Sequence, residues 1–241
     1  METHVEQHQQ PAAPGIGEFK AVPLNELHPA PWNARKYFDE AALNDLAKDL
    51  RLNGQAQPIL VRPRPSGGHE VVAGERRFRA AKLAGFATID VVVREMPDLE
   101  ARRQSITENL NREDLNPYEE TAGILDLLSL ELSGARKWMN LLDAHESSRD
   151  ATAWVLRLCA KSYPEVHPKA LLALGMEARE LEEIINTVFG ERAGMTVRSF
   201  VNNRLPLLRL PEDVREALES GWIEYSKANV IAGIEDEERR K

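Results

Sequence analysis

The fold of the first half of this chain depends on the stretch Gly74-Glu75-Arg76-Arg77-Phe78-Arg79-Ala80, which joins a predicted strand to a predicted helix. The preceding Glu-Val-Val-Ala has the composition of a strand, and Gly74 permits both a tight turn and the close approach of another group. The first turn of a helix carries N–H groups without intrahelical partners, and three arginines add charge-assisted donors. The stretch therefore predicts a phosphate-binding turn. A solvated basic helix face is the simpler alternative.

The residues around this stretch predict a small α+β module. Strands and helices follow one another from residue 19 to residue 115, separated mostly by glycine or proline. Two strands form a hairpin that leads into Gly74, and the helix that begins there ends at Gly85. Asp39 is the expected N-cap of the first helix. The predicted strands are 20–22, 58–62, 69–73 and 88–94, and the predicted helices are 39–54, 74–85 and 97–109.

In the second half of the chain, the spacing of apolar residues predicts helices and no strands. Asn116, Pro117 and Glu119 supply an N-cap, a first-turn proline and a third-position glutamate, which mark the start of a helix that extends to about Leu132. We therefore expect a disordered polar tail at 1–18, an α+β domain at 19–115 and an all-helical domain at 116–241. Further helical spacing recurs at 151–160, 169–174, 178–189, 198–210, 212–220 and 227–234.

The distribution of charge limits where nucleic acid can bind. The net charge is −8, from 39 acidic and 31 basic residues, whereas binding of DNA phosphates relies on Lys and Arg. Residues 194–211, by contrast, contain three arginines and no acid. This short basic segment is therefore expected to face DNA while the rest of the chain repels it.

Composition argues against several other classes of protein. No apolar run reaches membrane-spanning length, and the start lacks the regions of a signal peptide, so we expect a cytoplasmic protein. The single cysteine, Cys159, excludes an internal disulfide and a cysteine-based zinc site. Because it lies in an apolar helical run, we expect it in the core. The six histidines are scattered and show no ligand spacing.

Two motifs in order show a family resemblance. The heptapeptide GERRFRA at 74–80 is followed at 108–120 by ENLNREDLNPYEE, and together they resemble the ParB family of chromosome and plasmid partition proteins. The resemblance covers residues 19–120 and, less closely, 194–232. It implies a ParB-like N-terminal module, whose fold is shared with sulfiredoxin, followed by a helix-turn-helix domain. The C-terminal dimer domain of the family is expected to be absent or truncated.

The resemblance also implies a site for CTP and Mg²⁺. In the family, GERRxRA holds the triphosphate, ENxxR contributes oxygen atoms to Mg²⁺, and a QPI segment lies beside the base. Oxygen ligands of this kind suit Mg²⁺. The simpler alternatives are ordinary helix-end polarity for ENxxR and a structural proline for QPI. Residues 33–38 also resemble a segment near the nucleotide. The implied nucleotide residues are Gln57, Pro58, Ile59, Gly74, Glu75, Arg76, Arg77, Phe78, Arg79, Ala80, Glu108, Asn109 and Arg112, with Glu108 and Asn109 as metal ligands.

Residues 194–211 resemble the recognition helix of the family, and 178–189 are the expected first helix of the same helix-turn-helix unit. Polar residues near the start of a recognition helix contact base edges. A core helix with one polar face is the alternative. Residues 133–193 include more sequence than is typical of the family, so no DNA target sequence is implied. The predicted DNA-binding residues are Thr196, Arg198, Ser199, Asn202, Asn203 and Arg204.

The function implied by the resemblance is a homodimeric DNA clamp, associated with the nucleoid or a plasmid. It loads at a centromere-like parS site, closes with CTP, slides, and reopens as a slow CTPase forms CDP and phosphate. A ParA-type ATPase is the implied partner, although residues 1–19 contain no Lys or Arg with which to activate it.

Two alternatives to the clamp remain. One is an enzyme of the same fold, either a nuclease or a sulfiredoxin-like phosphotransferase. The motif region shows neither the carboxylate cluster that a nuclease needs nor a cysteine in the phosphate loop. The other is a helix-turn-helix repressor that uses no nucleotide, which leaves both motifs unexplained.

Overall fold

The structure is a computed structural model, and it describes residues 17–32, 40–112, 115–162, 165–190, 195–220, 222–234 and 238. The chain divides into two compact units, residues 1–101 and 102–241. Most of the predicted tail, the 33–38 segment and the predicted N-cap Asp39 lie outside the described residues, whereas Glu18 begins the first strand.

The first unit contains a mixed five-stranded sheet in the order β1-β5-β3-β4-β2. The predicted hairpin is confirmed, because β3 and β4 pair antiparallel. Strand β5 pairs parallel with β3 and antiparallel with β1. The sequence did not predict β2, which pairs parallel with β4 after a short 3-10 helix, η1 (Leu24–Glu26). The strands are β1 (Glu18–Pro23), β2 (Leu27–Pro29), β3 (Ile59–Pro63), β4 (His69–Ala73) and β5 (Thr88–Val93).

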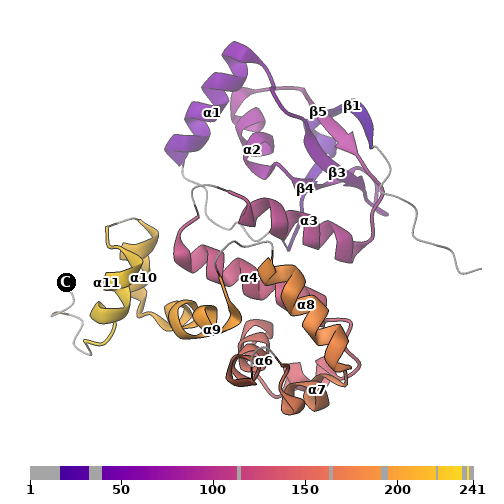
Figure 1. The fold of residues 1–241 in the computed structure, drawn as a ribbon. Helices are drawn as coiled ribbons and strands as arrows, with labels where there is room; N and C mark the ends of the chain where they lie inside the picture. The colour runs from indigo at the N-terminus through magenta and orange to yellow at the C-terminus, as the bar shows by residue number, and fades with distance from the viewer. Residues whose placement is uncertain are drawn as a thin grey trace, which may run out of the picture. The chain divides into compact units, whose positions relative to one another are not determined.

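Helices α1 (Glu40–Asn53) and α2 (Glu75–Ala84) pack against each other beside this sheet (Figure 1). Arg51 of α1 donates hydrogen bonds to the carbonyl oxygens of Leu83 and Ala84, at 2.6 and 3.2 Å. These carbonyl groups at the end of α2 have no partner within their own helix, so Arg51 supplies one. Alternate residues of the strands meet the apolar faces of both helices. The resulting core includes Ala47, Leu50, Ile59, Val61, Val71, Phe78, Ala81, Ile89 and Val91.

An ion-pair network links the hairpin to α3 (Asp98–Leu110), a helix whose first residues belong to the first unit. Arg62 lies 2.6 Å from a carboxylate oxygen of Glu70 and 2.6 Å from one of Asp98, with the Arg62 and Glu70 side chains only 13% and 12% exposed. Burial is the largest single influence and opposes the charge of Arg62, but the hydrogen bonds to Asp98 and Glu70 and the charges of these carboxylates together outweigh it and raise the pKa of the guanidinium.

The second unit is helical in its described residues, as the sequence predicts. The predicted start of α4 (Pro117–Leu132) is confirmed as a capping box: Asn116 Oδ1 accepts from the N–H of Glu119 at 2.9 Å, and Glu119 Oε2 accepts from the N–H of Asn116 at 3.3 Å. The sequence did not predict α5 (Trp138–Asp143). The remaining regular helices are α6 (Ser148–Ser162), α7 (Pro168–Leu174), α8 (Ala178–Gly190), α10 (Glu212–Glu219) and α11 (Tyr225–Ile231).

The prediction of one continuous helix over 198–210 is wrong in detail. The segment comprises one helical turn, α9 (Val197–Ser199), then a π-helical turn, η2 (Phe200–Arg204), and a 3-10 helix, η3 (Leu205–Arg209). Pro206 explains the change, since proline has no N–H to donate and its ring clashes with the carbonyl four residues earlier. The N–H of Leu205 instead donates to the carbonyl oxygen of Phe200, five residues back.

The core of the second unit joins α4, α6 and α8 to this irregular segment. Phe200 is fully buried, and its ring meets that of Phe189 edge to face at 5.4 Å. Cys159 is buried, as predicted, and burial raises the pKa of its thiol. None of the described helices has the length and apolar character that a membrane span requires.

Candidate functional site

The predicted phosphate turn joins β4 directly to α2. Gly74 has φ 95° and ψ 27°, a left-handed conformation, and no side chain caps the helix that begins at Glu75. A Cβ at Gly74 would lie 3.1 Å from Nη2 of Arg77, so this position requires glycine for both its conformation and its space. The turn therefore presents the N-terminus of a ten-residue helix, where N–H groups and the helix dipole attract an anion.

The three arginines of the turn have different surroundings. Nη1 of Arg77 donates to the carbonyl oxygens of Gln57 and Pro58, at 3.0 and 2.6 Å. Arg79 donates to the buried carboxylate of Glu75 at 2.5 and 2.8 Å. Arg76 is half-buried and forms no hydrogen bond or ion pair with any residue in the described ranges. Arg76 is therefore the arginine best placed to bind a phosphate.

The structure brings Gln57 and Pro58 together with the phosphate turn through Arg77. No sequence signal predicted this contact, because a long side chain reaches backbone atoms about twenty residues away. Three other implied nucleotide residues lie in the core: Ile59, Phe78 and Ala80 are at most 1% exposed. Their side chains support the turn, and only their backbone atoms can meet a ligand.

The second implied motif lies at the end of α3, within the second unit. Glu108 is exposed, and Asn109 Oδ1 accepts a hydrogen bond from Arg112 Nη1 at 3.2 Å. Among the described residues there is no group of three or more His, Cys, Asp or Glu that could hold a metal ion. Two oxygen donors fit Mg²⁺, which usually binds through one or two protein groups plus phosphate oxygens. The donors present therefore suit a metal that arrives with a nucleotide.

The predicted DNA-binding residues lie on α9 and η2. Thr196 caps the segment by accepting from the N–H of Ser199 at 3.1 Å. Arg198, Asn202 and Asn203 are exposed, together with Thr196, while Val197, Phe200 and Leu205 are buried. The segment thus has one apolar side in the core and one polar side in solvent, as a recognition helix requires.

Two arginines of this segment bind elsewhere in the protein. Nη2 of Arg204 lies 3.2 Å from a carboxylate oxygen of Glu120 on α4, and both side chains are largely buried, at 22% and 25% exposed. Arg198 Nε donates to the carbonyl oxygen of Ala160, at the end of α6, at 3.4 Å. Arg204 therefore holds the segment on α4, whereas Arg198 is an exposed residue beside α6.

We expect Gly74→Ala to destabilise the first unit more than Gly85→Ala. Both glycines have positive φ, 95° and 79°, so alanine costs about 1 to 2 kcal/mol at either position. A Cβ at Gly74 also meets Arg77, whereas the structure has no heavy atom within 4 Å of one at Gly85. Urea unfolding followed by circular dichroism measures both losses. Gly85→Ala is the matched control for backbone strain, and equal losses would show that Arg77 moves aside without cost.

Comparison with known proteins agrees with these features. Residues 7–110 match the model of the ParB N-terminal domain, and residues 187–241 match that of the ParB HTH domain. A probable plasmid-partitioning protein ParB of Thermus thermophilus is 40% identical over 208 residues, which are 86% of this chain and 63% of that protein. A probable chromosome 2-partitioning protein ParB of Deinococcus radiodurans is 34% identical over 220 residues, 91% of this chain and 65% of that protein.

The chain thus spans slightly less than two thirds of the length of these two relatives. The solved structure of a Pnob8-like ParB-N domain has the same fold, with a TM-score of 0.52 at 15% identity, over 89% of this chain and 79% of that one. The two ParB domain models match in order along the chain, and the chain is 34 to 40% identical to the two ParB relatives. This protein therefore belongs to the ParB family.

Proposed function

We propose that this protein acts in chromosome or plasmid partition as a DNA clamp controlled by CTP. The observation that carries the proposal is the turn at Gly74, where an uncapped helix N-terminus, Arg76 and the segment held by Arg77 converge. The relatives from Thermus thermophilus and Deinococcus radiodurans are named as partitioning proteins, which supports the same role here. A homodimer with a ParA-type ATPase as partner completes the proposed assembly.

The turn suits a nucleoside triphosphate. The N–H groups at the start of α2 bind phosphate oxygens, and Arg76 adds a charge-assisted fork. Arg77 holds the backbone at Gln57 and Pro58 beside the turn. When the phosphates of a nucleotide bind at the turn, its base can therefore contact this segment. Glu108 and Asn109 would hold Mg²⁺, which supplies positive charge to the triphosphate when bound.

Nucleotide titration tests this site. CTP with Mg²⁺ is expected to bind more tightly than ATP, GTP or UTP, and Arg76→Ala to weaken CTP binding about tenfold, the loss expected for one charge-assisted hydrogen bond. Lys48→Ala removes an exposed charge of the same sign on α1 and is the control. Isothermal titration calorimetry gives both affinities. Equal affinity for CTP and ATP would contradict the proposed selectivity.

The exposed side of α9 and η2 suits the major groove. Thr196, Ser199, Asn202 and Asn203 have side chains that pair with base edges, and Arg198 carries positive charge beside them. In η2 the wider π turn sets the direction of Asn202 and Asn203. The buried side, together with the Arg204–Glu120 ion pair, holds this surface on the helical core.

Asn202→Ala is expected to weaken binding to a specific DNA site about tenfold, because a paired base contact contributes about 1 to 3 kcal/mol. CTP binding in the absence of DNA should not change. Asn140→Ala, an exposed asparagine on α5, is the matched control. Fluorescence anisotropy with duplexes enriched from genomic DNA by the wild-type protein measures the effect. Unchanged affinity would place the recognition surface elsewhere.

The clamp itself is tested through the second motif. We expect Glu108→Ala to bind specific DNA normally but to lose retention on closed circular DNA with CTP, since oxygen ligands that assemble only in the closed state would favour closure. Wild-type protein should stay on the circle at high salt only with CTP, and Asp143→Ala, an exposed carboxylate on α5, should behave like the wild type. Release of CDP in the same reaction measures the proposed slow CTPase. Retention that does not depend on CTP would favour a repressor that uses no nucleotide.

A further inference from the structure

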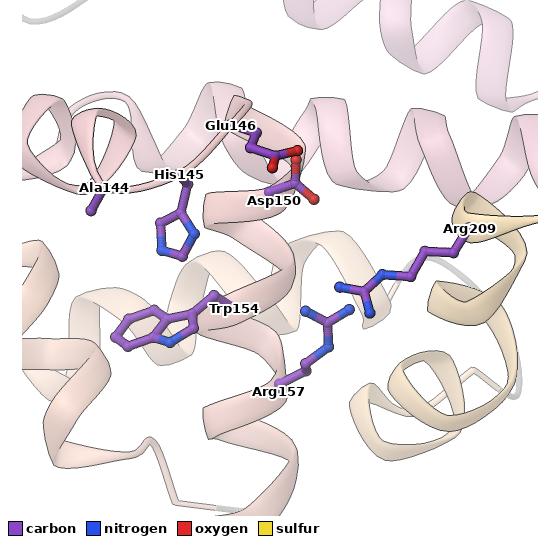
Figure 2. A pocket seen from close by; sticks show the side chains of 7 residues that line it. All are labelled: Ala144, His145, Glu146, Asp150, Trp154, Arg157 and Arg209. Carbon is purple, nitrogen blue, oxygen red and sulfur yellow. The ribbon is translucent and has the colours of Figure 1, made fainter.

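A pocket of about 410 Å³ lies beside α6 and the end of η3, within the second unit. Most of its lining belongs to residues 133–193, the part of the chain in which the family resemblance is weakest, and neither sequence motif accounts for it. Figure 2 shows its lining side chains, which are Ala144, His145, Glu146, Asp150, Trp154, Arg157 and Arg209.

Two arginines define one side of this pocket. Arg157 extends from α6 and Arg209 from the end of η3, and their guanidinium groups point toward each other (Figure 2). Within the described ranges, neither forms a hydrogen bond or an ion pair. Burial and the charge of Arg209 lower the pKa of Arg157. Two like charges held close together are unfavourable until an anion binds between them, and two guanidinium forks suit the oxygen atoms of a phosphate.

The other side of the pocket limits what can bind. The carboxylate of Asp150 accepts a hydrogen bond from Ser147 Oγ at 2.6 Å, and the exposed Glu146 lies near it (Figure 2). The rings of His145 and Trp154 also line the pocket, and their centroids lie 5.8 Å apart. Because the two carboxylates repel further negative charge, the pocket suits a single phosphate group and disfavours a di- or triphosphate.

The location of the arginine pair connects it with DNA. Arg209 is the last residue of η3, which directly follows the proposed recognition segment of α9 and η2, and the Arg198–Ala160 hydrogen bond joins the start of that segment to the end of α6. Lys161 is exposed on α6, four residues after Arg157, so the two basic side chains share one face of that helix. Basic side chains thus flank the segment at both of its ends.

We propose that Arg157 and Arg209 together bind one phosphate of the DNA backbone beside the recognition segment. The inference rests on the proposed DNA binding and adds α6 to the DNA-binding surface. Contacts with phosphates fix the register of a protein on the duplex and carry no sequence information. The arginine pair would therefore position the segment and strengthen binding to every sequence equally.

Salt-dependent affinity of the full chain tests the inference. Two duplexes of equal length are used, one enriched from genomic DNA by the wild-type protein and one of random sequence. Arg157→Gln and Arg209→Gln should each weaken binding to both duplexes by the same factor, about tenfold. The double variant should weaken binding further than either single variant, because only it leaves the phosphate without a charged partner. In the double variant the slope of log affinity against log salt should fall by about 0.9, the value for one phosphate contact.

Matched variants separate the outcomes. Arg136→Gln removes an exposed arginine of the same unit that lies outside the pocket, and it reports the effect of net charge alone. Arg209→Lys keeps the charge without the fork, so it should retain the salt slope but lose part of the affinity. Because Arg209 is exposed, its variants should fold even where Arg157→Gln does not, and thermal melting checks this.

Each remaining outcome identifies what failed. If the wild-type protein binds neither duplex, the proposed function is wrong. If the wild type binds and both arginine variants behave like Arg136→Gln, the phosphate site is wrong while the proposed function stands. If the variants lose binding of inorganic phosphate, measured by calorimetry, but keep full DNA affinity, the pocket takes a free phosphate and the DNA assignment is overturned.

Discussion

The first unit depends on the contact between Arg77 and the carbonyl oxygens of Gln57 and Pro58 across the left-handed turn at Gly74. Glycine is favoured because φ is +95° at this position and because a Cβ there would lie 3.1 Å from Nη2 of Arg77. The contact ties the start of β3 to the start of α2, and hence the proposed base-binding segment to the proposed phosphate site. Arg77 is a charged side chain that donates to two carbonyl oxygens and so positions the backbone, and Arg76 is therefore the arginine that we propose for phosphate.

In the second unit, the segment of α9 and η2 presents a polar surface to solvent while its other side belongs to the core. Pro206 interrupts the regular helix, and the chain continues as a π turn and a 3-10 turn. Phe200 and Leu205 remain buried through this change, and Arg204 binds Glu120 on α4. The exposed asparagines therefore stand on a packed base, as the proposed contacts with DNA would require. The same packing brings α6, and with it Arg157, beside this segment.

The sequence alone predicted the hairpin, the glycine-bounded helix after it and the start of α4, because each depends on contacts within a few residues. The capping box at Asn116 and Glu119 is an example, since its donors and acceptors are three positions apart. The sequence also identified the motifs whose residue types suit phosphate and Mg²⁺. It did not predict β2 or α5, which are short elements stabilised by their neighbours.

Only the tertiary structure decided which partner each arginine binds. Arg76, Arg77 and Arg79 are equivalent in a sequence motif, yet Arg77 binds carbonyl oxygens of another segment and Arg79 binds a buried carboxylate. The sequence predicts Arg204 as a DNA contact from its place in the segment, and the structure adds an ion pair between Arg204 and Glu120 on α4. Arg157 and Arg209, 52 positions apart, meet only in the folded chain. The physical reason is that a long charged side chain takes its partner from whatever the fold brings within reach, and that choice is set by packing between distant segments.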